Sequence, residues 1–148
     1  SDIVYDLYCG AGTIGIYISK FVKKVYGIEI VEDAVKDAKI NAKKNNIKNI
    51  SFYCGDLKDI LNTDVMNNIL LPSIIIVDPP RPGLHPNTVK NLLALRPNKI
   101  IYVSCNPATM ARDIEILINE KYSIKDLQPI DMFPHTPHVE CVTTLILN

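Results

Sequence analysis

Residues 3–15, IVYDLYCGAGTIG, decide the fold, because an apolar strand pattern runs directly into three closely spaced glycines. Gly10, Gly12 and Gly15 form a G-x-G-x-x-G arrangement. Glycine at these places permits a tight turn and lets a ligand approach the backbone closely. The stretch therefore predicts the first strand–turn–helix unit of an α/β fold that binds a nucleotide at the turn.

Acidic residues near the ends of the next two strand patterns support this interpretation. Glu29 ends the second pattern, where a carboxylate can accept hydrogen bonds from both hydroxyls of a ribose. Asp56 stands just past the third, where it can hold an adenine amino group or simply face solvent. Two ligands suit this geometry: a dinucleotide such as NAD, with its pyrophosphate at the helix N-terminus, and S-adenosylmethionine.

The rest of the chain alternates apolar, β-rich runs with helical patterns. Such alternation is typical of a mostly parallel sheet with helices on both faces, and we therefore expect a Rossmann-like α/β fold. The predicted strands are Ile3–Tyr8, Val25–Ile30, Ile50–Cys54, Ile74–Val77 and Ile100–Val103.

The clearest helix pattern covers Val31–Asn45, and a second helix is expected at Ala108–Asn119. Apolar residues of the first pattern recur at the spacing of one buried helix face: Val31, Ala34, Val35, Ala38 and Ala42. Two long strand patterns, Tyr122–Phe133 and Cys141–Leu147, follow with a proline-containing turn between them. The sheet is therefore predicted to end in an antiparallel hairpin.

Composition limits the class of protein. The 148 residues, 47% of them hydrophobic, suffice for one domain, residues 1–148, with a substantial core. A formal net charge of +0 gives no strong field toward a polyanion. We see neither an apolar run of roughly 20 residues nor a signal-peptide pattern, so we expect a cytoplasmic protein without a membrane segment. No C-x-x-C pair occurs among the cysteines, so we expect reduced thiols and no metal site.

The stretch DPPRPG, Asp78–Gly83, follows the fourth strand pattern. Its prolines favour an extended loop that places Asp78 at the carboxyl edge of the sheet. A dehydrogenase has no need of such a loop, whereas methyltransferases often place one beside the sulfonium and the methyl acceptor. Arg81 can hold an RNA phosphate or a base oxygen, or form a salt bridge. The loop favours a methyltransferase that uses S-adenosylmethionine.

The stretch Lys99–Asp113, KIIYVSCNPATMARD, places Cys105 between a strand and a helix. Asn106 is a favourable N-cap and Pro107 suits the first helical position, so the thiol stands beside a helix N-terminus. Partial positive charge there favours the thiolate, and we expect Cys105 to be a nucleophile. The remaining cysteines lie in or beside strand patterns and are expected to have packing roles: Cys9, Cys54 and Cys141.

A nucleophile of this kind usually needs a base, and residues 133–140, FPHTPHVE, offer one. If the last two strands form a hairpin, its turn lies at the carboxyl end of the sheet. Glu140 then faces the same rim as Cys105 and Asp78. His135 and His138 are alternatives, although a loop histidine more often forms structural hydrogen bonds.

Together the stretches DLYCGAGTIG, DPPRPG, SCNPATMARD and FPHTPHVE resemble the catalytic domain of the RNA (uracil-5-)-methyltransferases, which make 5-methyluridine in transfer and ribosomal RNA. The resemblance covers nearly the whole chain, and SCNP followed by HVE is its most specific part. It implies a class I methyltransferase fold, with Cys105 as nucleophile and Glu140 as base. It also implies that the S-adenosylmethionine pocket includes Tyr8, Thr13, Glu29, Asp56 and Asp78.

The chemistry of this family agrees with the residues. Uracil C5 is a weak nucleophile, and addition of a thiolate at C6 creates an enolate that can attack the sulfonium methyl. Glu140 would then remove the C5 proton, which allows Cys105 to leave. Because stacking shields C6, the expected substrate is an unpaired or flipped uridine, with ribosomal RNA preferred over transfer RNA.

The sequence departs from the family by what it lacks. Members generally carry upstream RNA-binding regions, often an OB-like domain and sometimes an iron–sulfur cluster, and a Gln before the glycine loop that helps to hold the cofactor. This sequence starts two residues before the first strand pattern and contains none of these. We therefore expect a piece of a longer protein that, alone, binds cofactor weakly and RNA poorly.

Three other functions stay open on the sequence alone. A dehydrogenase domain that selects NAD through Glu29 would leave DPPRPG and Glu140 unexplained. A methyltransferase for a small molecule or a nitrogen acceptor would be expected to follow DPP with an aromatic residue, where Arg81 stands. A non-catalytic assembly domain of an RNA enzyme would not need Cys105.

Overall fold

The computed structural model describes residues 2–61 and 69–148. The chain forms two compact units, residues 1–75 and 76–148. The first contains β1 (Ile3–Leu7), α1 (Thr13–Ile18), η1 (Ser19–Phe21), β2 (Lys24–Glu29), α2 (Glu32–Lys44), β3 (Ile50–Cys54) and α3 (Leu57–Leu61). After β4 (Ile74–Val77), the second contains α4 (Pro86–Leu95), β5 (Lys99–Ser104), α5 (Pro107–Glu120), β6 (Tyr122–Ile130) and β7 (Glu140–Leu147). No helix among the described residues is both long and apolar enough to cross a membrane.

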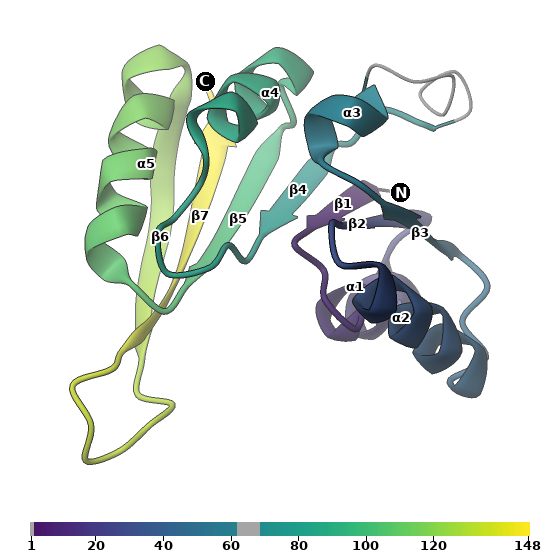
Figure 1. The fold of residues 1–148 in the computed structure, drawn as a ribbon. Helices are drawn as coiled ribbons and strands as arrows, with labels where there is room; N and C mark the ends of the chain where they lie inside the picture. The colour runs from purple at the N-terminus through teal and green to yellow at the C-terminus, as the bar shows by residue number, and fades with distance from the viewer. Residues whose placement is uncertain (1, 62–68) are drawn as a thin grey trace. The chain divides into compact units, whose positions relative to one another are not determined.

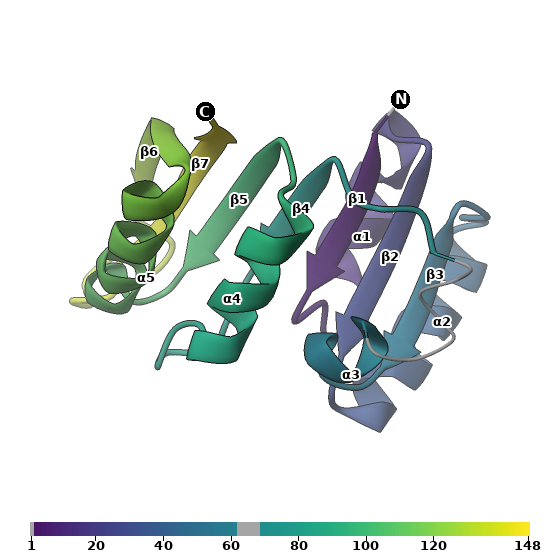
Figure 2. The same cartoon turned by 90° about the horizontal axis from the view of Figure 1, so that it is seen from above.

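Three parallel strands form the centre of the first unit, in the order β3-β2-β1. Helices α1 and α2 cover one face of these strands, and α3 lies on the other (Figures 1 and 2). Because both faces are covered, β1 and β2 are buried along most of their length, as continuous apolar strand patterns predict. Val4, Val25 and Ile28 belong to this core.

The predicted elements of the first unit agree with the structure to within a few residues, with one correction at the start of α2. Val31 has an extended backbone, with φ −86° and ψ 110°, and is the N-cap of a helix that begins at Glu32. Its N–H donates to Glu29 Oε1 at 2.9 Å, and its side chain is 54% exposed. The prediction that Val31 lies on the buried face is therefore wrong, and that face consists of Val35, Ala38 and Ala42.

The second unit ends in three antiparallel strands, in the order β5-β7-β6. Figure 2 shows α4 and α5 on the same side of these strands. Alternate residues of β5 are accordingly buried, Ile100, Tyr102 and Ser104. The predicted C-terminal hairpin is confirmed, although β6 ends at Ile130 rather than at Phe133.

Gly27, in the middle of β2, lets the strand pass close to an aromatic ring. A Cβ at this position would lie 2.5 Å from Phe52 Cδ1 and 3.0 Å from Cys9 Sγ, and both neighbours are buried. We expect Gly27→Ala to lower the free energy of unfolding by about 1–3 kcal/mol, the usual cost of overpacking a core. Urea unfolding followed by circular dichroism measures this difference.

The matched control is Phe52→Leu, alone and combined with Gly27→Ala. A smaller side chain at position 52 leaves room for the added methyl group, so Gly27→Ala should cost less stability in this background. An equal cost in both backgrounds would contradict the steric explanation.

Candidate active site

The glycine loop follows β1 and turns sharply into α1. Gly10 and Gly12 have positive φ angles of 51° and 81°, and a Cβ on Gly12 would lie 2.8 Å from the Phe52 ring. The N–H of Gly15 donates to Asp6 Oδ2 at 2.8 Å, and a Cβ on Gly15 would lie equally close to that oxygen. Glycine is therefore required here both by backbone conformation and by close packing.

Glu29, at the end of β2, holds this loop through its carboxylate. Oε2 accepts the N–H of Gly10 at 3.1 Å, and Oε1 accepts the N–H of Val31 at 2.9 Å. An ionised carboxylate has about four lone-pair sites, so these two bonds leave capacity for the hydroxyl groups of a ligand. Glu29 thus organises the loop and can still accept hydrogen bonds from a ribose.

Three further residues of the predicted cofactor site lie at the same strand ends of the first unit. Tyr8 directly follows β1 with a left-handed φ of 60°, and Thr13 is the exposed first residue of α1. Asp56 is exposed just past β3. The preceding N–H, that of Gly55, donates to the carbonyl oxygen of Glu29 at 2.9 Å, which joins the ends of β3 and β2. These carboxyl ends of parallel strands are where nucleotides bind in such folds.

Two hollows of the first unit lie on its helices and edge strand. One of about 390 Å³, between α1 and α2, has Thr13 and Tyr17 in its wall, and another of about 570 Å³ runs along α2 and β3 beside Lys43 and Lys48. Neither is lined by Glu29 or Asp56, so we assign no nucleotide to them. Among residues 2–61 and 69–148, no three His, Cys, Asp or Glu side chains gather in a way that could hold a metal ion.

Cys105 stands between the end of β5 and the start of α5 in the second unit. Asn106 is the N-cap, with its Oδ1 accepting the N–H of Ala108 at 3.2 Å, and Pro107 occupies the first helical position. The Oγ of Ser104 accepts the N–H of Asn106 at 2.9 Å and fixes the turn. The predicted cap is confirmed, and the half-buried thiol lies beside a helix N-terminus.

Glu140 is the first residue of β7, and the strand register brings it toward Cys105. The β5–β7 ladder ends with Ser104 opposite Cys141, so Cys105 and Glu140 are the next residues on the two strands. Asp78 follows β4, and the charge of the Glu140 carboxylate acts on it. Although Asp78 is exposed over part of its surface, partial desolvation by the protein and then the charge of Glu140 raise its pKa.

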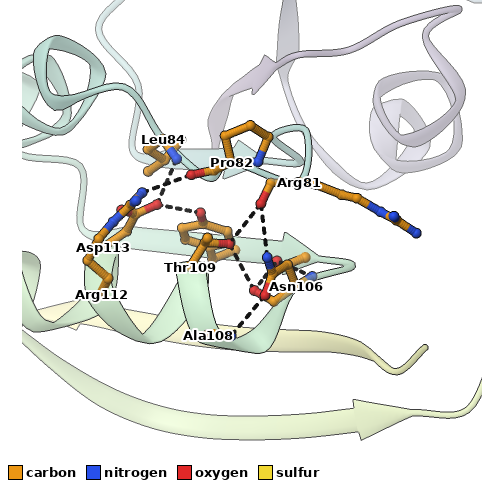
Figure 3. Close-up of polar contacts among 10 residues, drawn as sticks. Arg81, Pro82, Leu84, Asn106, Ala108, Thr109, Arg112 and Asp113 are labelled. Carbon is orange, nitrogen blue, oxygen red and sulfur yellow. Dashed lines mark hydrogen bonds and ion pairs between the residues drawn. The ribbon is translucent and has the colours of Figure 1, made fainter. Parts of the chain in front are cut away.

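Arg81 follows Asp78 in the loop after β4 and has two distinct parts. Its carbonyl oxygen accepts hydrogen bonds from Asn106 Nδ2 at 3.2 Å and Thr109 Oγ1 at 3.1 Å. Figure 3 shows its side chain running away from α5, and this side chain is exposed. Within the described part of the chain, the guanidinium forms no ion pair. The salt-bridge alternative therefore finds no support here.

The other cysteines differ from one another in burial. Cys9 and Cys141 are buried, whereas Cys54 is exposed at the end of β3. The packing role predicted for Cys54 is therefore wrong, because the strand runs out into solvent there. Burial, followed by the negative charges of Asp6 and Glu29, raises the pKa of the Cys9 thiol to about 12. Cys9 is consequently not a nucleophile at neutral pH.

The two histidines weighed as alternative bases lie in the turn between β6 and β7, and both are exposed. His135 has a left-handed φ of 69°. The backbone N–H of His138 donates to Thr136 Oγ1 at 3.3 Å. The β5–β7 register brings Glu140 to the end of β5 and does not include either histidine.

A second set of polar residues was not indicated by the sequence patterns. Thr109, Arg112 and Asp113 of α5 contact the backbone of the loop after β4 (Figure 3). All three belong to the stretch SCNPATMARD, and their i, i+3, i+4 spacing places them on one helix face. That spacing was the available signal, but it carried no indication of what the face contacts.

Comparison with known proteins gives a consistent result. The family model for tRNA (Uracil-5-)-methyltransferase matches residues 1–147. The chain is 51% identical over 147 residues to an uncharacterized RNA methyltransferase of Bacteroides thetaiotaomicron and 50% identical over 145 residues to one of Enterococcus faecalis. These matches cover 99% and 98% of this chain but 32% of each relative, so the chain spans about a third of their length. The family predicted from the motifs is confirmed.

Solved structures confirm the fold class. The Pyrococcus abyssi tRNA (uracil-54, C5)-methyltransferase in complex with S-adenosyl-L-homocysteine matches with a TM-score of 0.82 and 38% identity, over 99% of this chain and 34% of that one. A putative SAM-dependent methyltransferase from Streptococcus mutans matches with a TM-score of 0.80 over 99% of this chain and 44% of that one. At 14% identity, this second likeness concerns the fold alone.

The raised pKa of Asp78 gives a test of its proximity to Glu140. Desolvation and the neighbouring charge both favour the neutral acid in the folded state. Asp78 therefore destabilises the fold increasingly as pH rises from the ordinary carboxyl range, about 4, through its folded-state pKa. We expect Glu140→Gln to lower the pKa of Asp78 and to weaken this loss of stability. Carboxyl-carbon NMR titration measures the pKa, and urea unfolding across the same pH range measures the stability.

The control is Glu120→Gln, which removes an exposed carboxylate at the far end of α5. It should leave the Asp78 titration unchanged. If Glu140→Gln also left it unchanged, Glu140 would not lie close enough to act with the other residues of the site.

Proposed function

This chain belongs to the tRNA (uracil-5-)-methyltransferase family, and on that premise we propose that it transfers a methyl group from S-adenosylmethionine to C5 of a uridine in RNA. The chain spans about a third of the length of its relatives. The activity, the cofactor and the RNA substrate of the whole protein are therefore all part of the proposal.

The observation that carries the proposal is the juxtaposition at the end of the β5–β7 ladder. The last pair of this ladder joins Ser104 to Cys141. Cys105 directly follows the first of these residues in the chain, and Glu140 directly precedes the second. A thiol at a helix N-terminus and a carboxylate on the neighbouring strand are the nucleophile and base that methylation of a pyrimidine carbon needs. Neither a nicotinamide dehydrogenase nor an amine methyltransferase requires this pair.

The reaction follows from these two groups. The Cys105 thiolate adds to C6 of the uracil, and the electron pair of the C5–C6 double bond passes to the enolate. C5 then takes the methyl group from the sulfonium, whose sulfur keeps the bonding pair. Glu140 removes the proton from C5, the C5–C6 double bond re-forms, and the thiolate of Cys105 leaves. Every bond made to Cys105 is thus broken again, and the enzyme is restored once Glu140 releases its proton to solvent.

The strand ends of the first unit suit the cofactor. Gly10 has open space where a Cβ would stand, with no atom of a residue beyond its chain neighbours within 4 Å, so a ligand can approach its backbone. Glu29 keeps acceptor capacity for ribose hydroxyls, and exposed Asp56 can accept from an adenine amino group. S-adenosylmethionine, when bound, supplies the activated methyl group. The residues we propose to hold it are Tyr8, Gly10, Gly12, Thr13, Glu29, Asp56 and Asp78.

The proposed substrate is an unpaired or flipped uridine, because the thiolate must reach C6, which a stacked base shields. Exposed Arg81 would contact an RNA phosphate or a base oxygen. From the sequence we favour ribosomal RNA, and this preference stays a prediction. The Pyrococcus abyssi relative, a tRNA methyltransferase by name, makes transfer RNA the alternative. Methylation assays of the full-length protein on both RNAs decide between them.

Cys105→Ala should abolish both methyl transfer and covalent capture of the substrate. We expect the full-length protein, mixed with S-adenosylmethionine and an RNA loop that contains 5-fluorouridine, to form an adduct on Cys105. Fluorine cannot leave C5 as a proton does, so the intermediate is trapped. Intact-mass spectrometry followed by peptide mapping measures the adduct.

The matched control is Cys54→Ala, which removes the exposed thiol of β3 and should leave adduct formation unchanged. If the full-length wild-type protein gave no adduct with either ribosomal or transfer RNA sequences, the uracil-C5 mechanism would be wrong.

Glu140→Gln should separate the two halves of the reaction. An amide cannot take the C5 proton, so we expect turnover to fall about 10²–10⁴-fold, the usual contribution of a general base. The methylated adduct on Cys105 should then accumulate even with ordinary uridine RNA. Quenched reactions analysed by mass spectrometry measure this accumulation, with Glu120→Gln as the control. Normal turnover of Glu140→Gln would transfer the role of base to another residue, with the exposed His138 tested next.

A further inference from the structure

Three side chains on one face of α5 hold the backbone of the loop after β4. Thr109 Oγ1 lies 3.1 Å from the carbonyl oxygen of Arg81 and 3.1 Å from that of Asn106, and its one O–H is shared between them. Arg112 donates from a terminal guanidinium nitrogen to the carbonyl oxygen of Pro82 at 3.0 Å. Asp113 Oδ2 accepts the N–H of Leu84 at 2.7 Å. Residues 81, 82 and 84 are therefore tied to α5, the helix that begins at Pro107, two residues after Cys105 (Figure 3).

Asp113 is the centre of this arrangement. It is 1% exposed, and a carboxylate at that depth must have its oxygens paired. Oδ2 also accepts the hydroxyl of Tyr102 in β5 at 2.8 Å, and Oδ1 accepts two N–H groups of Arg112 at 2.9 and 2.6 Å. Burial, and then this hydrogen bond, raises the pKa of Tyr102, so its hydroxyl stays a donor.

Gly83 shows independently that the loop is pressed against α5. Its φ is +81°, and a Cβ there would lie 2.6 Å from Asp113 Oδ2 and 3.1 Å from Thr109 Cβ. Any other residue would be strained in its backbone and would push the loop away from the helix. Apolar side chains on α5 would be enough to pack against this loop. The presence of polar side chains at such close approach therefore points to a requirement for a fixed loop position.

We infer that Thr109, Arg112 and Asp113 are positioning residues, which fix the backbone of Arg81 relative to Cys105 so that the exposed Arg81 side chain presents the RNA to the thiol. This inference rests on the proposed function, because it assigns Arg81 to the RNA. The carbonyl oxygen of Arg81 is held twice, while its guanidinium is left facing solvent. These bonds to the backbone, which form a tether, therefore restrain the position of the Arg81 Cα and leave the guanidinium available to bind a ligand.

A purely structural role predicts different behaviour. In that case a weakened tether would lower stability, and the remaining folded protein would work equally well with or without Arg81. If the tether acts through Arg81, weakening the tether should lower activity only while the Arg81 side chain is present. A double-mutant cycle on the full-length protein separates these two possibilities.

The cycle combines Thr109→Val with Arg81→Ala. Valine keeps the shape of threonine but cannot donate to the Arg81 carbonyl, and Thr109→Ser, which keeps the hydroxyl, is the matched control. We expect Thr109→Val to lower kcat/KM for RNA about 10-fold, within the range that small misplacement of reacting groups causes. In the Arg81→Ala background it should cause no further loss, and Thr109→Ser should be near wild type. Equal losses in both backgrounds, or no loss in either, would overturn the inference.

Amide hydrogen exchange tests the tether without any catalysis. The loop peptide covering residues 79–85 should exchange faster in Thr109→Val and in Asp113→Asn than in wild type or Thr109→Ser. Asparagine keeps one oxygen for Leu84 but turns an N–H₂ group toward Arg112, so this variant breaks the contact with Arg112 selectively. Unchanged exchange in both variants would refute the tether even in an active enzyme. Faster exchange in a protein that methylates no RNA would instead refute the proposed function and leave the tether standing.

Discussion

The buried carboxylate of Asp113 determines how the loop after β4, strand β5 and helix α5 fit together. A charge that is 1% exposed is tolerated only when donors surround it. Leu84, Tyr102 and Arg112 supply those donors, one from each of the three elements. The loop, the strand and the helix must therefore adopt one relative arrangement for the charge to be satisfied. That arrangement also fixes where Cys105 stands with respect to the DPPRPG loop.

Strand direction explains why the remaining groups of the second unit reach the same place. Cys105 follows the end of β5, whereas Glu140 begins β7. In a parallel pair these positions would lie at opposite ends of the sheet. Because β7 is antiparallel to β5, its first residue instead lies beside the last residue of β5. The C-terminal hairpin thus has a chemical consequence, since it brings a carboxylate to the thiol.

Burial and charge give the cysteines and carboxyls of the chain different environments. Burial, and then the charges of Asp6 and Glu29, raise the pKa of the Cys9 thiol, whereas Cys105 is half-buried at a helix N-terminus. Asp78 is held near Glu140 at some cost to stability, since both desolvation and like charge favour its neutral form. Like charges held together in a folded protein are typical of functional sites, because packing alone does not require them.

The sequence by itself determined the order of strands and helices, the glycine turn, the cap before α5 and the family. Each of these depends on residues close together in the chain: glycine at positive φ, Asn106 and Pro107 at a helix start, and apolar periodicity. Only the tertiary structure decided that Val31 and Cys54 are exposed. It alone also showed that Thr109, Arg112 and Asp113 form hydrogen bonds with the backbone of a loop some 30 residues earlier in the chain. Periodicity shows that a helix face exists, but what that face contacts depends on long-range packing and on the need to pair a buried charge, and neither is encoded in local spacing.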